Sequence, residues 1–328
     1  MQSIPALPWN RCVEMIIVYI IHILFLDIDS PNSKKKHLFI TIENKVSMAA
    51  RIIDGKKIAG KILNDLKSKI RNMKEKPGLA LVLVGDNPAS EIYVNFKEKA
   101  CKDVGFYCER FDLDKDISEI DLLKLVSDLN QKPNLHGILV QLPLPKQIDE
   151  KLITNSILPH KDVDGFTPVS LGSLISENTI LAPATARAIL HLIESTGIKI
   201  EGKNAVVVGR SNIVGKPTAM MLLEKNATVT ICHSKTKNLA EHTKKADILV
   251  VAVGRPRLIT KEMVKEGSVI IDVGINRLDG KVIGDVDFDN VKDAAGFITP
   301  VPGGVGPMTI AMLMENTLKA MKLAQKIT

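Results

Sequence analysis

Several features that would place the chain in a familiar class are missing from its 328 residues. The four cysteines form neither a C-x-x-C pair nor any other metal-ligand pattern, so the sequence predicts reduced thiols and no metal site. The apolar run at residues 15–26 is too short for the ~20 residues that span a bilayer. These absences argue against a disulfide-rich secreted domain, a metalloprotein and a membrane protein.

Residues 1–47 also lack the pattern of the rest of the chain. Only Arg11 precedes the apolar run as a cation, and no small-residue cleavage site follows it, so we expect no secretory signal. An ordinary globular pattern begins at Met48. We therefore expect a cytoplasmic protein whose functional part starts at Met48, with residues 1–47 as an extension outside it.

Positive charge is in excess but is not concentrated. The net charge is +7, yet the basic residues are scattered through presumed helices with acidic residues between them. This distribution is typical of solvated helix faces, and it attracts small anions without forming a nucleic-acid groove. We expect no nucleic-acid partner. A nucleotide sensor or nucleic-acid-binding protein is the alternative, and it would need a clustered basic face.

Apolar strands and amphipathic helices alternate from Met48 onward, without low-complexity segments or internal repeats. Near-continuous apolar runs closed by glycine or proline are typical of strands buried in a parallel sheet. The pattern predicts strands at 78–84, 137–143, 206–208, 228–232, 248–253 and 269–273, and helices at 56–73, 90–104, 117–130, 185–195 and from Met308 onward. It therefore predicts an α/β protein of two domains.

One predicted strand ends in the turn G-R-S-N-I-V-G at 209–215, which leads into a helical segment. Small residues let a backbone approach a pyrophosphate, whose charge is favoured by the free N–H groups and the dipole of the following helix. The usual G-x-G-x-x-G spacing is absent, because the turn offers only Gly209, Ser211 and Gly215. It predicts a dinucleotide site, with a plain strand-to-helix turn as the alternative.

The segment after the next predicted strand lacks the acidic residue that usually binds the adenosine ribose of NAD. Residues 233–236 read H-S-K-T instead, with Ser234 as a hydroxyl donor, and Arg210 adds a cation from the first turn. Cationic and hydroxyl groups accept the 2′-phosphate of NADP. These residues favour NADP over NAD, with a solvated basic loop as the alternative.

Polar residues interrupt the apolar pattern near the ends of predicted strands, where open α/β sheets bind their ligands. Tyr93 and Lys97 are four apart in a predicted helix and project from one face of it. Gln141 ends a strand, and Asp162 and Asp164 lie in an irregular segment before a glycine. Each has an ordinary structural alternative: a core aromatic, a surface lysine, a strand cap and turn formers. Their shared position at one sheet edge favours a functional site.

From Ala49 to its end, the chain resembles the bifunctional methylenetetrahydrofolate dehydrogenase/cyclohydrolase family almost continuously. The motifs that carry this resemblance occur in order: V-G-D-N-P-A-S at 84–90 with Tyr93 and Lys97 after it, G-I-L-V-Q-L-P-L-P at 137–145, K-D-V-D-G-F at 161–166, G-R-S-N-I-V-G at 209–215, D-V-G-I-N at 272–276 and T-P-V-P-G-G-V-G-P-M-T at 299–309. The resemblance implies NADP-dependent oxidation of 5,10-methylenetetrahydrofolate to the methenyl cation, and hydrolysis of that cation to 10-formyltetrahydrofolate.

The same resemblance implies roles for four residues on the folate side. Lys97 is central to hydrolysis: an ammonium beside a cationic substrate would be repelled, so we expect a buried lysine with a lowered pKa that assists proton transfer as water adds. Gln141 holds the lysine by a hydrogen bond, and Tyr93 lies against the folate ring. Asp164 accepts N–H bonds from the pterin, whereas Asp162 is expected to shape the turn.

On the cofactor side, the resemblance implies a site for NADP, a wall of the cleft at residues 300–307, and a homodimer. The cofactor-binding residues it points to are Gly209, Arg210, Ser211, Ser234 and Ile275. The fold it implies has two α/β domains with a cleft between them: a folate-binding catalytic domain at 48–182 plus 300–328, and a Rossmann-type NADP-binding domain at 183–299.

Two observations qualify this interpretation. Where relatives commonly read P-C-T-P-x-G, this chain has Pro183 followed by Ala184, Ala186 and Ala188 at the changed positions, so we expect the link between the domains to differ slightly. A short-chain dehydrogenase, which has its own Tyr-x-x-x-Lys, is the alternative enzyme. There the pair follows the dinucleotide turn, whereas Tyr93 precedes the turn here.

Overall fold

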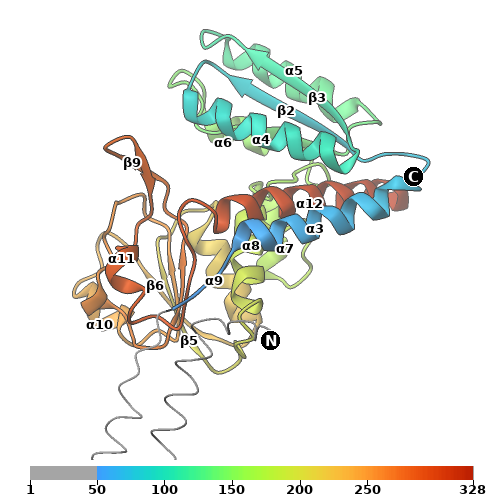
Figure 1. Ribbon diagram of the computed structural model, residues 1–328. Helices are drawn as coiled ribbons and strands as arrows, with labels where there is room; N and C mark the ends of the chain where they lie inside the picture. The colour runs from blue at the N-terminus through green and yellow to red at the C-terminus, as the bar shows by residue number, and fades with distance from the viewer. Residues whose placement is uncertain (1–49, 328) are drawn as a thin grey trace, which may run out of the picture. The chain divides into compact units, whose positions relative to one another are not determined.

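A computed structural model of the protein describes residues 50–327 (Figure 1). The expectation that residues 1–47 form an extension lies outside the described residues. Within them, two separate parallel sheets carry most of the strands. No helix of this part of the chain is long and apolar enough to cross a membrane.

The larger sheet has six strands in the order β1-β11-β8-β7-β5-β6, and all of its neighbouring pairs are parallel. Its strands are β1 (Arg51–Ile52), β11 (Phe297–Ile298), β8 (Val269–Asp272), β7 (Ile248–Val251), β5 (Asn204–Val208) and β6 (Thr228–Cys232). The interior strands β7 and β8 are buried along their whole length, which explains their unbroken apolar sequences. All six carboxyl ends therefore point to one edge of the sheet.

The smaller sheet has three parallel strands in the order β3-β2-β4. They are β3 (Tyr107–Leu113), β2 (Gly78–Val84) and β4 (Gly137–Val140). Alternate residues of the central strand β2 face opposite layers, because side chains alternate along a strand. Leu79, Leu81 and Leu83 pack toward helix α4 (Pro88–Val104), whereas Ala80, Val82 and Val84 pack toward α5 (Glu119–Gln131).

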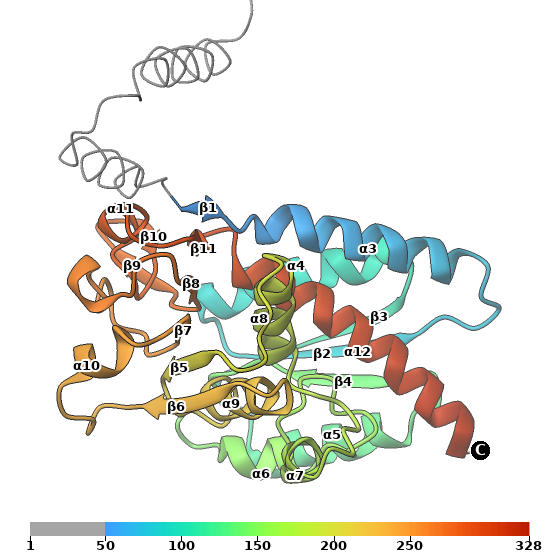
Figure 2. The ribbon, with the colours of Figure 1, turned by 90° about the horizontal axis from the view of Figure 1, so that it is seen from below.

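A layer of helices connects the two sheets. Helix α12 (Val305–Ile327) packs against α3 (Gly55–Arg71), α4 and α8 (Ala184–Glu194), and Figure 2 shows it running from beside β8 and β11 across to the smaller sheet. One apolar cluster accordingly includes Leu81 of β2 and Val250 of β7 together with Met312 of α12. The two sheets thus share a continuous core.

The other elements are short and surround the sheets. They are α6 (Glu150–Asn155), α7 (Pro168–Ile175), α9 (Gly215–Glu224), α10 (Leu239–Thr243), the 3-10 helix η1 (Lys261–Met263), α11 (Phe288–Val291) and the antiparallel hairpin of β9 (Asn276–Leu278) with β10 (Lys281–Ile283). The predicted alternation of strands and helices in two α/β parts is confirmed. The predicted strand at 137–143 ends earlier, at Val140, because prolines at 143 and 145 supply no N–H for a sheet.

Candidate active site and dinucleotide site

Lys97 and Gln141 meet at the carboxyl end of the smaller sheet. Helix α4 places Lys97 with only 8% of its surface exposed, and Nζ of the lysine donates a hydrogen bond of 2.9 Å to Oε1 of Gln141. Gln141 follows β4 directly, and its Nε2 donates to the carbonyl of Leu142 at 2.7 Å. This second bond fixes the amide so that its oxygen faces the lysine. Burial lowers the pKa of Lys97, and the carboxylate of Asp164 opposes part of that shift.

Asp164 belongs to the same group, whereas Asp162 supports the backbone behind it. Burial raises the pKa of Asp164, the positive charge of Lys97 lowers it, and the neighbouring Asp162 raises it again. The carboxylate of Asp162 accepts hydrogen bonds from Thr167 N at 2.8 Å and from Ser170 Oγ at 2.7 Å. Asp162 therefore caps the turn into α7, which leaves Asp164 as the carboxylate available near Lys97.

Tyr93 lies one helical turn before Lys97 and is partly exposed. Burial raises the pKa of its hydroxyl, and the charge of Arg277 on the β9 strand lowers it. An aromatic ring, an amine and a carboxylate are thus held near the end of β4. They offer one planar surface, one proton acceptor and one acceptor for N–H groups.

The turn between β5 and α9 is built by its two glycines. Gly209 has a φ of +133°, and a Cβ on it would overlap the carbonyl oxygen of Ala252 in the loop after β7. A Cβ on Gly215 would overlap the carbonyl of Gly209. The glycines therefore allow the turn to fold tightly against the neighbouring strand's loop, which is the geometry of a dinucleotide-binding turn.

Donors for a phosphate surround this turn. Ser211 Oγ accepts from Val214 N at 3.1 Å and from Gly215 N at 3.3 Å, so its hydroxyl caps the start of α9. Arg210 and Ser234 are exposed, the first in the turn and the second just beyond β6. Ile275 is 51% exposed beyond β8. A tight glycine turn, a helix start, an exposed cation and exposed hydroxyls fit a phosphorylated dinucleotide.

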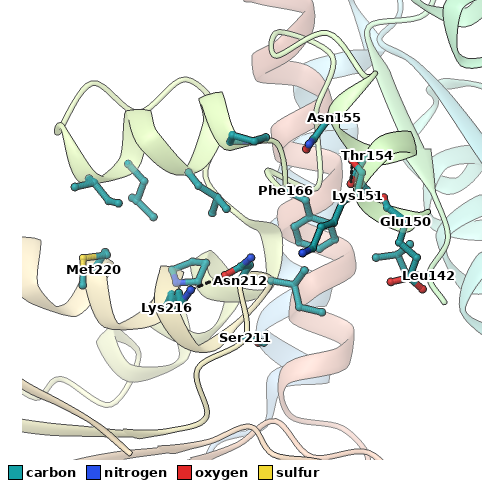
Figure 3. Close-up of a pocket in the computed structure, with 16 residues that line it drawn as sticks. Leu142, Glu150, Lys151, Thr154, Asn155, Phe166, Ser211, Asn212, Lys216 and Met220 are labelled. Atoms are coloured by element: carbon teal, nitrogen blue, oxygen red, sulfur yellow. Dashed lines mark hydrogen bonds between the residues drawn. The ribbon is translucent and has the colours of Figure 1, made fainter. Parts of the chain in front are cut away.

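A cavity of about 650 Å³ lies between the smaller-sheet part and this turn (Figure 3). Leu142 and Phe166 line one side, and Ser211, Asn212 and Lys216 line the other, where Lys216 Nζ donates to Asn212 Oδ1 at 2.8 Å. Leu142 is the neighbour of Gln141, and Phe166 follows Asp164 by two residues. The cavity therefore joins the dinucleotide turn to residues that neighbour Gln141 and Asp164 in the sequence, and Tyr93, Lys97, Gln141 and Asp164 are not among its lining residues.

Two buried carboxylates near the dinucleotide site, Asp272 and Asp285, are not among the candidate residues that the sequence predicts. Asp272 ends β8, and three backbone N–H groups donate to it; burial raises its pKa to about 6. Asp285 is fully buried beyond β10. A polar residue that ends an apolar strand was a usable signal for Asp272. Residues 284–287 read G-D-V-D, which resembles an ordinary exposed turn. Among residues 50–327, no cluster of three His, Cys, Asp or Glu side chains suits a metal ion.

The three alanines of the altered P-C-T-P-x-G segment are buried in α8. The helix begins at Ala184 directly after Pro183, so it forms without a second proline. Arg187, between two of these alanines, donates to Glu315 Oε2 at 2.6 Å and to Asn316 Oδ1 at 2.7 Å. The segment is therefore anchored to α12.

These features define a class: an α/β protein with a glycine-rich dinucleotide turn and a second, buried polar site at the end of its smaller sheet. Comparison with known proteins defines the family. Residues 53–164 match the tetrahydrofolate dehydrogenase/cyclohydrolase catalytic domain, and residues 183–325 match the NAD(P)-binding domain of the same family. The chain belongs to the tetrahydrofolate dehydrogenase/cyclohydrolase family.

Individual relatives are similar over nearly their whole length. The bifunctional protein FolD of Brevibacillus brevis is 53% identical over 283 residues, which are 85% of this chain and 100% of that protein. The crystal structure of the FolD enzyme of Campylobacter jejuni is 48% identical with a TM-score of 0.82, covering 84% of this chain and 99% of that one. A Trypanosoma brucei FolD structure, complexed with NADP cofactor and inhibitor, is 37% identical with a TM-score of 0.82 and covers 85% and 99% of the two chains.

Proposed function

We propose that the protein oxidises 5,10-methylenetetrahydrofolate with NADP and hydrolyses the resulting methenyl cation to 10-formyltetrahydrofolate. The observation that carries the proposal is the buried Lys97, hydrogen-bonded to Gln141 and facing the charge of Asp164, in a chain that also carries a dinucleotide turn. Full-length similarity to bifunctional FolD proteins supports both activities. Two steps on one substrate need such an arrangement, since the cation formed in the first is consumed in the second.

Lys97 serves the hydrolytic step. The methenyl substrate is a cation, so it favours a neutral amine at Nζ, and burial already lowers the pKa of this lysine. Water adds to the carbon that bridges the two nitrogens, and the Lys97 amine accepts the proton that the water releases. Gln141 keeps Nζ in place through Oε1. The amine can then return the proton to the ring nitrogen as its bond to the bridging carbon breaks.

Asp164 and Tyr93 hold the folate. The carboxylate of Asp164 accepts two N–H bonds from the pterin, and such donors favour its ionised form, which burial disfavours in the protein alone. Tyr93 contributes its ring face to the pterin and is placed by the same helix as Lys97. The oxidation step requires mainly that the bridging carbon be held in one position, so no acid or base of the chain takes part in it.

The dinucleotide turn holds NADP. Gly209 and Ser211, at the start of α9, would receive the pyrophosphate, Arg210 and Ser234 would bind the 2′-phosphate, and Ile275 would offer an apolar surface beyond β8. When bound, the nicotinamide supplies the hydride acceptor. The chain's own contribution is to orient the folate against it.

Different parts of the chain bind the folate and the NADP. Residues 48–182 and 300–328 form the folate-binding part, and residues 183–299 form the NADP-binding part, as the packing of α12 against α3 and α4 supports. The short strand β1 pairs with β11 in the larger sheet, so residues 51–52 cross to the NADP-binding part. The family's NAD(P)-binding match spans residues 183–325 and so groups α12 with the NADP-binding part, against which α12 also packs through α8. We group α12 with the folate-binding part because it packs against both α3 and α4. We further propose a homodimer in the cytoplasm.

A short-chain dehydrogenase is the weaker candidate. Its tyrosine and lysine would have to follow the dinucleotide turn, but Tyr93 and Lys97 lie on α4, beside the smaller sheet. The test of the proposed function is an absorbance assay of methenyltetrahydrofolate. We expect it to form from methylenetetrahydrofolate with NADP and to decay faster with the protein than without it. A protein that accelerates neither step would overturn the proposal.

A further inference from the structure

Asp285 is a fully buried carboxylate that accepts four hydrogen bonds. Oδ2 accepts from Val253 N at 2.7 Å and from Gly254 N at 3.0 Å. Oδ1 accepts from Arg255 N at 2.8 Å and from Asn276 Nδ2 at 2.9 Å. All four donors are neutral N–H groups, so the buried carboxylate is stabilised by oriented dipoles rather than by a cation.

The four donors come from two segments that follow strands of the larger sheet. Residues 253–255 lie in the loop after β7, and Asn276 is the first residue of β9, which residues 273–275 connect to β8. The first loop touches the cofactor turn, because the carbonyl of Ala252 leaves no room for a Cβ on Gly209. In doubly wound sheets, the two halves of a dinucleotide lie across the carboxyl ends of strands on either side of the first turn. With the adenosine half at β6, the nicotinamide half reaches β7 and β8.

A second carboxylate fixes Asp285 in turn. Asp272 Oδ1 accepts from Asp285 N at 2.9 Å, and its Oδ2 accepts from Val286 N at 2.9 Å. Two glycines allow this approach, since a Cβ on Gly274 would overlap the Asp285 side chain and one on Gly284 would overlap that of Asp272. The segment that carries Asp285 is therefore hydrogen-bonded to the end of β8, and the Asp285 side chain is hydrogen-bonded to the loop after β7.

We propose that Asp285 is a positioning residue for the cofactor: it holds the loops after β7 and β8 in the conformation that receives the nicotinamide half of the dinucleotide. The inference rests on the proposed function. It makes a specific distinction, because the nicotinamide half is common to NADP and NAD. Loss of Asp285 weakens the binding of both, whereas loss of a 2′-phosphate contact weakens the binding of NADP alone.

The test compares Asp285→Asn with Asp279→Asn, which makes the same chemical change at an exposed residue between β9 and β10. Binding is measured by NADPH and NADH fluorescence titration, and hydrolysis of added methenyltetrahydrofolate is measured without nucleotide. We expect Asp285→Asn to weaken the binding of both nucleotides about tenfold, as loss of one charge-assisted hydrogen bond would. We expect hydrolysis to stay near the wild-type rate and Asp279→Asn to change neither.

Unchanged nucleotide affinity in a folded Asp285→Asn protein would overturn the inference, as would an equal fall of hydrolysis and binding, or an effect on NADPH alone. If that variant does not fold, Asn276→Ala removes only one of the four donors. This variant should weaken the binding of both NADPH and NADH, but by less than Asp285→Asn would. Unchanged binding would overturn the inference. If the wild-type protein binds NADPH but catalyses neither reaction, the proposed function is wrong. The titration of the Asp285→Asn protein would still test whether Asp285 positions the nucleotide.

Discussion

Nζ of Lys97 lies 2.9 Å from Oε1 of Gln141, although the two residues are 44 positions apart in the chain. The lysine comes from α4 and the glutamine from the end of β4, so the hydrogen bond joins a helix to the sheet that it covers. The amide of Gln141 cannot turn without losing its bond to the carbonyl of Leu142. The hydrogen bond therefore holds the Lys97 amine in one position, where burial and Asp164 determine its pKa.

Two substitutions at Gln141 should move the pKa of Lys97 in opposite directions. Gln141→Glu adds a carboxylate, which favours the ammonium and raises this pKa, so the acid limb of the hydrolysis profile should move to higher pH. Gln141→Leu removes an acceptor that favours the ammonium, so the limb should move to lower pH with a reduced maximum. The measurement is the pH dependence of kcat/KM for methenyltetrahydrofolate.

The matched control is Gln147→Leu, because Gln147 is exposed and its amide bonds only the carbonyl of Lys115. It should leave the profile unchanged. Shifts of the same sign in both Gln141 variants would show that Gln141 does not set the charge of Lys97.

Arg210 should distinguish NADP from NAD. Its exposed guanidinium lies in the turn before α9, and loss of a charge-assisted contact costs about 1.5–3 kcal/mol. Arg210→Ala should raise the KM for NADP about tenfold or more while changing that for NAD little. Lys225→Ala, at the far end of α9, is the control for lost positive charge. Equal effects on both dinucleotides would contradict a 2′-phosphate contact.

Asn316 should matter for stability rather than for chemistry. It is buried in α12, and its Nδ2 donates to the carbonyls of Val163 at 2.8 Å and Ala182 at 2.9 Å. Asn316→Ala leaves both carbonyls without this donor and should lower the free energy of unfolding by about 2–4 kcal/mol. Chemical denaturation measures it, with Asn290→Ala at an exposed site as control. A loss below about 0.5 kcal/mol would show that these bonds do not hold α12 in place.

Asp272 should make a measurable part of stability depend on pH. Its pKa of about 6 in the folded protein exceeds the ordinary value of 3.8, so the folded state binds this proton more tightly than the unfolded state. Its contribution to the free energy of unfolding should therefore rise as pH falls, by about 2 kcal/mol from pH about 7.5 to about 4.5. The difference between wild type and Asp272→Asn isolates it. A difference that is constant with pH would refute the raised pKa.

Local sequence predicted the elements whose signal is local. The buried strand at 78–84, the helix that ends before Gly105, and the strand at 228–232 follow from apolar runs and turn residues, although the helix begins at Pro88 rather than at 90. Strand β3 was missed, because charged residues at 109, 110 and 112 interrupt its apolar residues at a sheet edge. Strands β1 and β11 pair across most of the chain and contain two residues each, so no local pattern reveals them.

In the candidate site too, the sequence predicts what depends on local pattern and misses what depends on contacts between distant segments. Tyr93, Lys97 and Asp164 are polar residues at predicted strand ends or on one helix face, and the sequence could group them. The expectation that Asp162 shapes the turn is confirmed by its hydrogen bonds with Thr167 N and Ser170 Oγ. The sequence could not show that Asp285 gathers donors from two segments, because that arrangement depends on the approach of residues 9 to 32 positions away in the chain.

The central claim is that one cleft performs two reactions and that Lys97 is needed only for the second. The most direct measurement is of both rates in Lys97→Gln, which keeps a polar side chain of similar length on α4 but removes the amine. We expect hydrolysis of methenyltetrahydrofolate to fall to the uncatalysed rate, while NADP-dependent oxidation of methylenetetrahydrofolate stays measurable and its product accumulates. Hydrolysis by this variant at the wild-type rate would contradict the account.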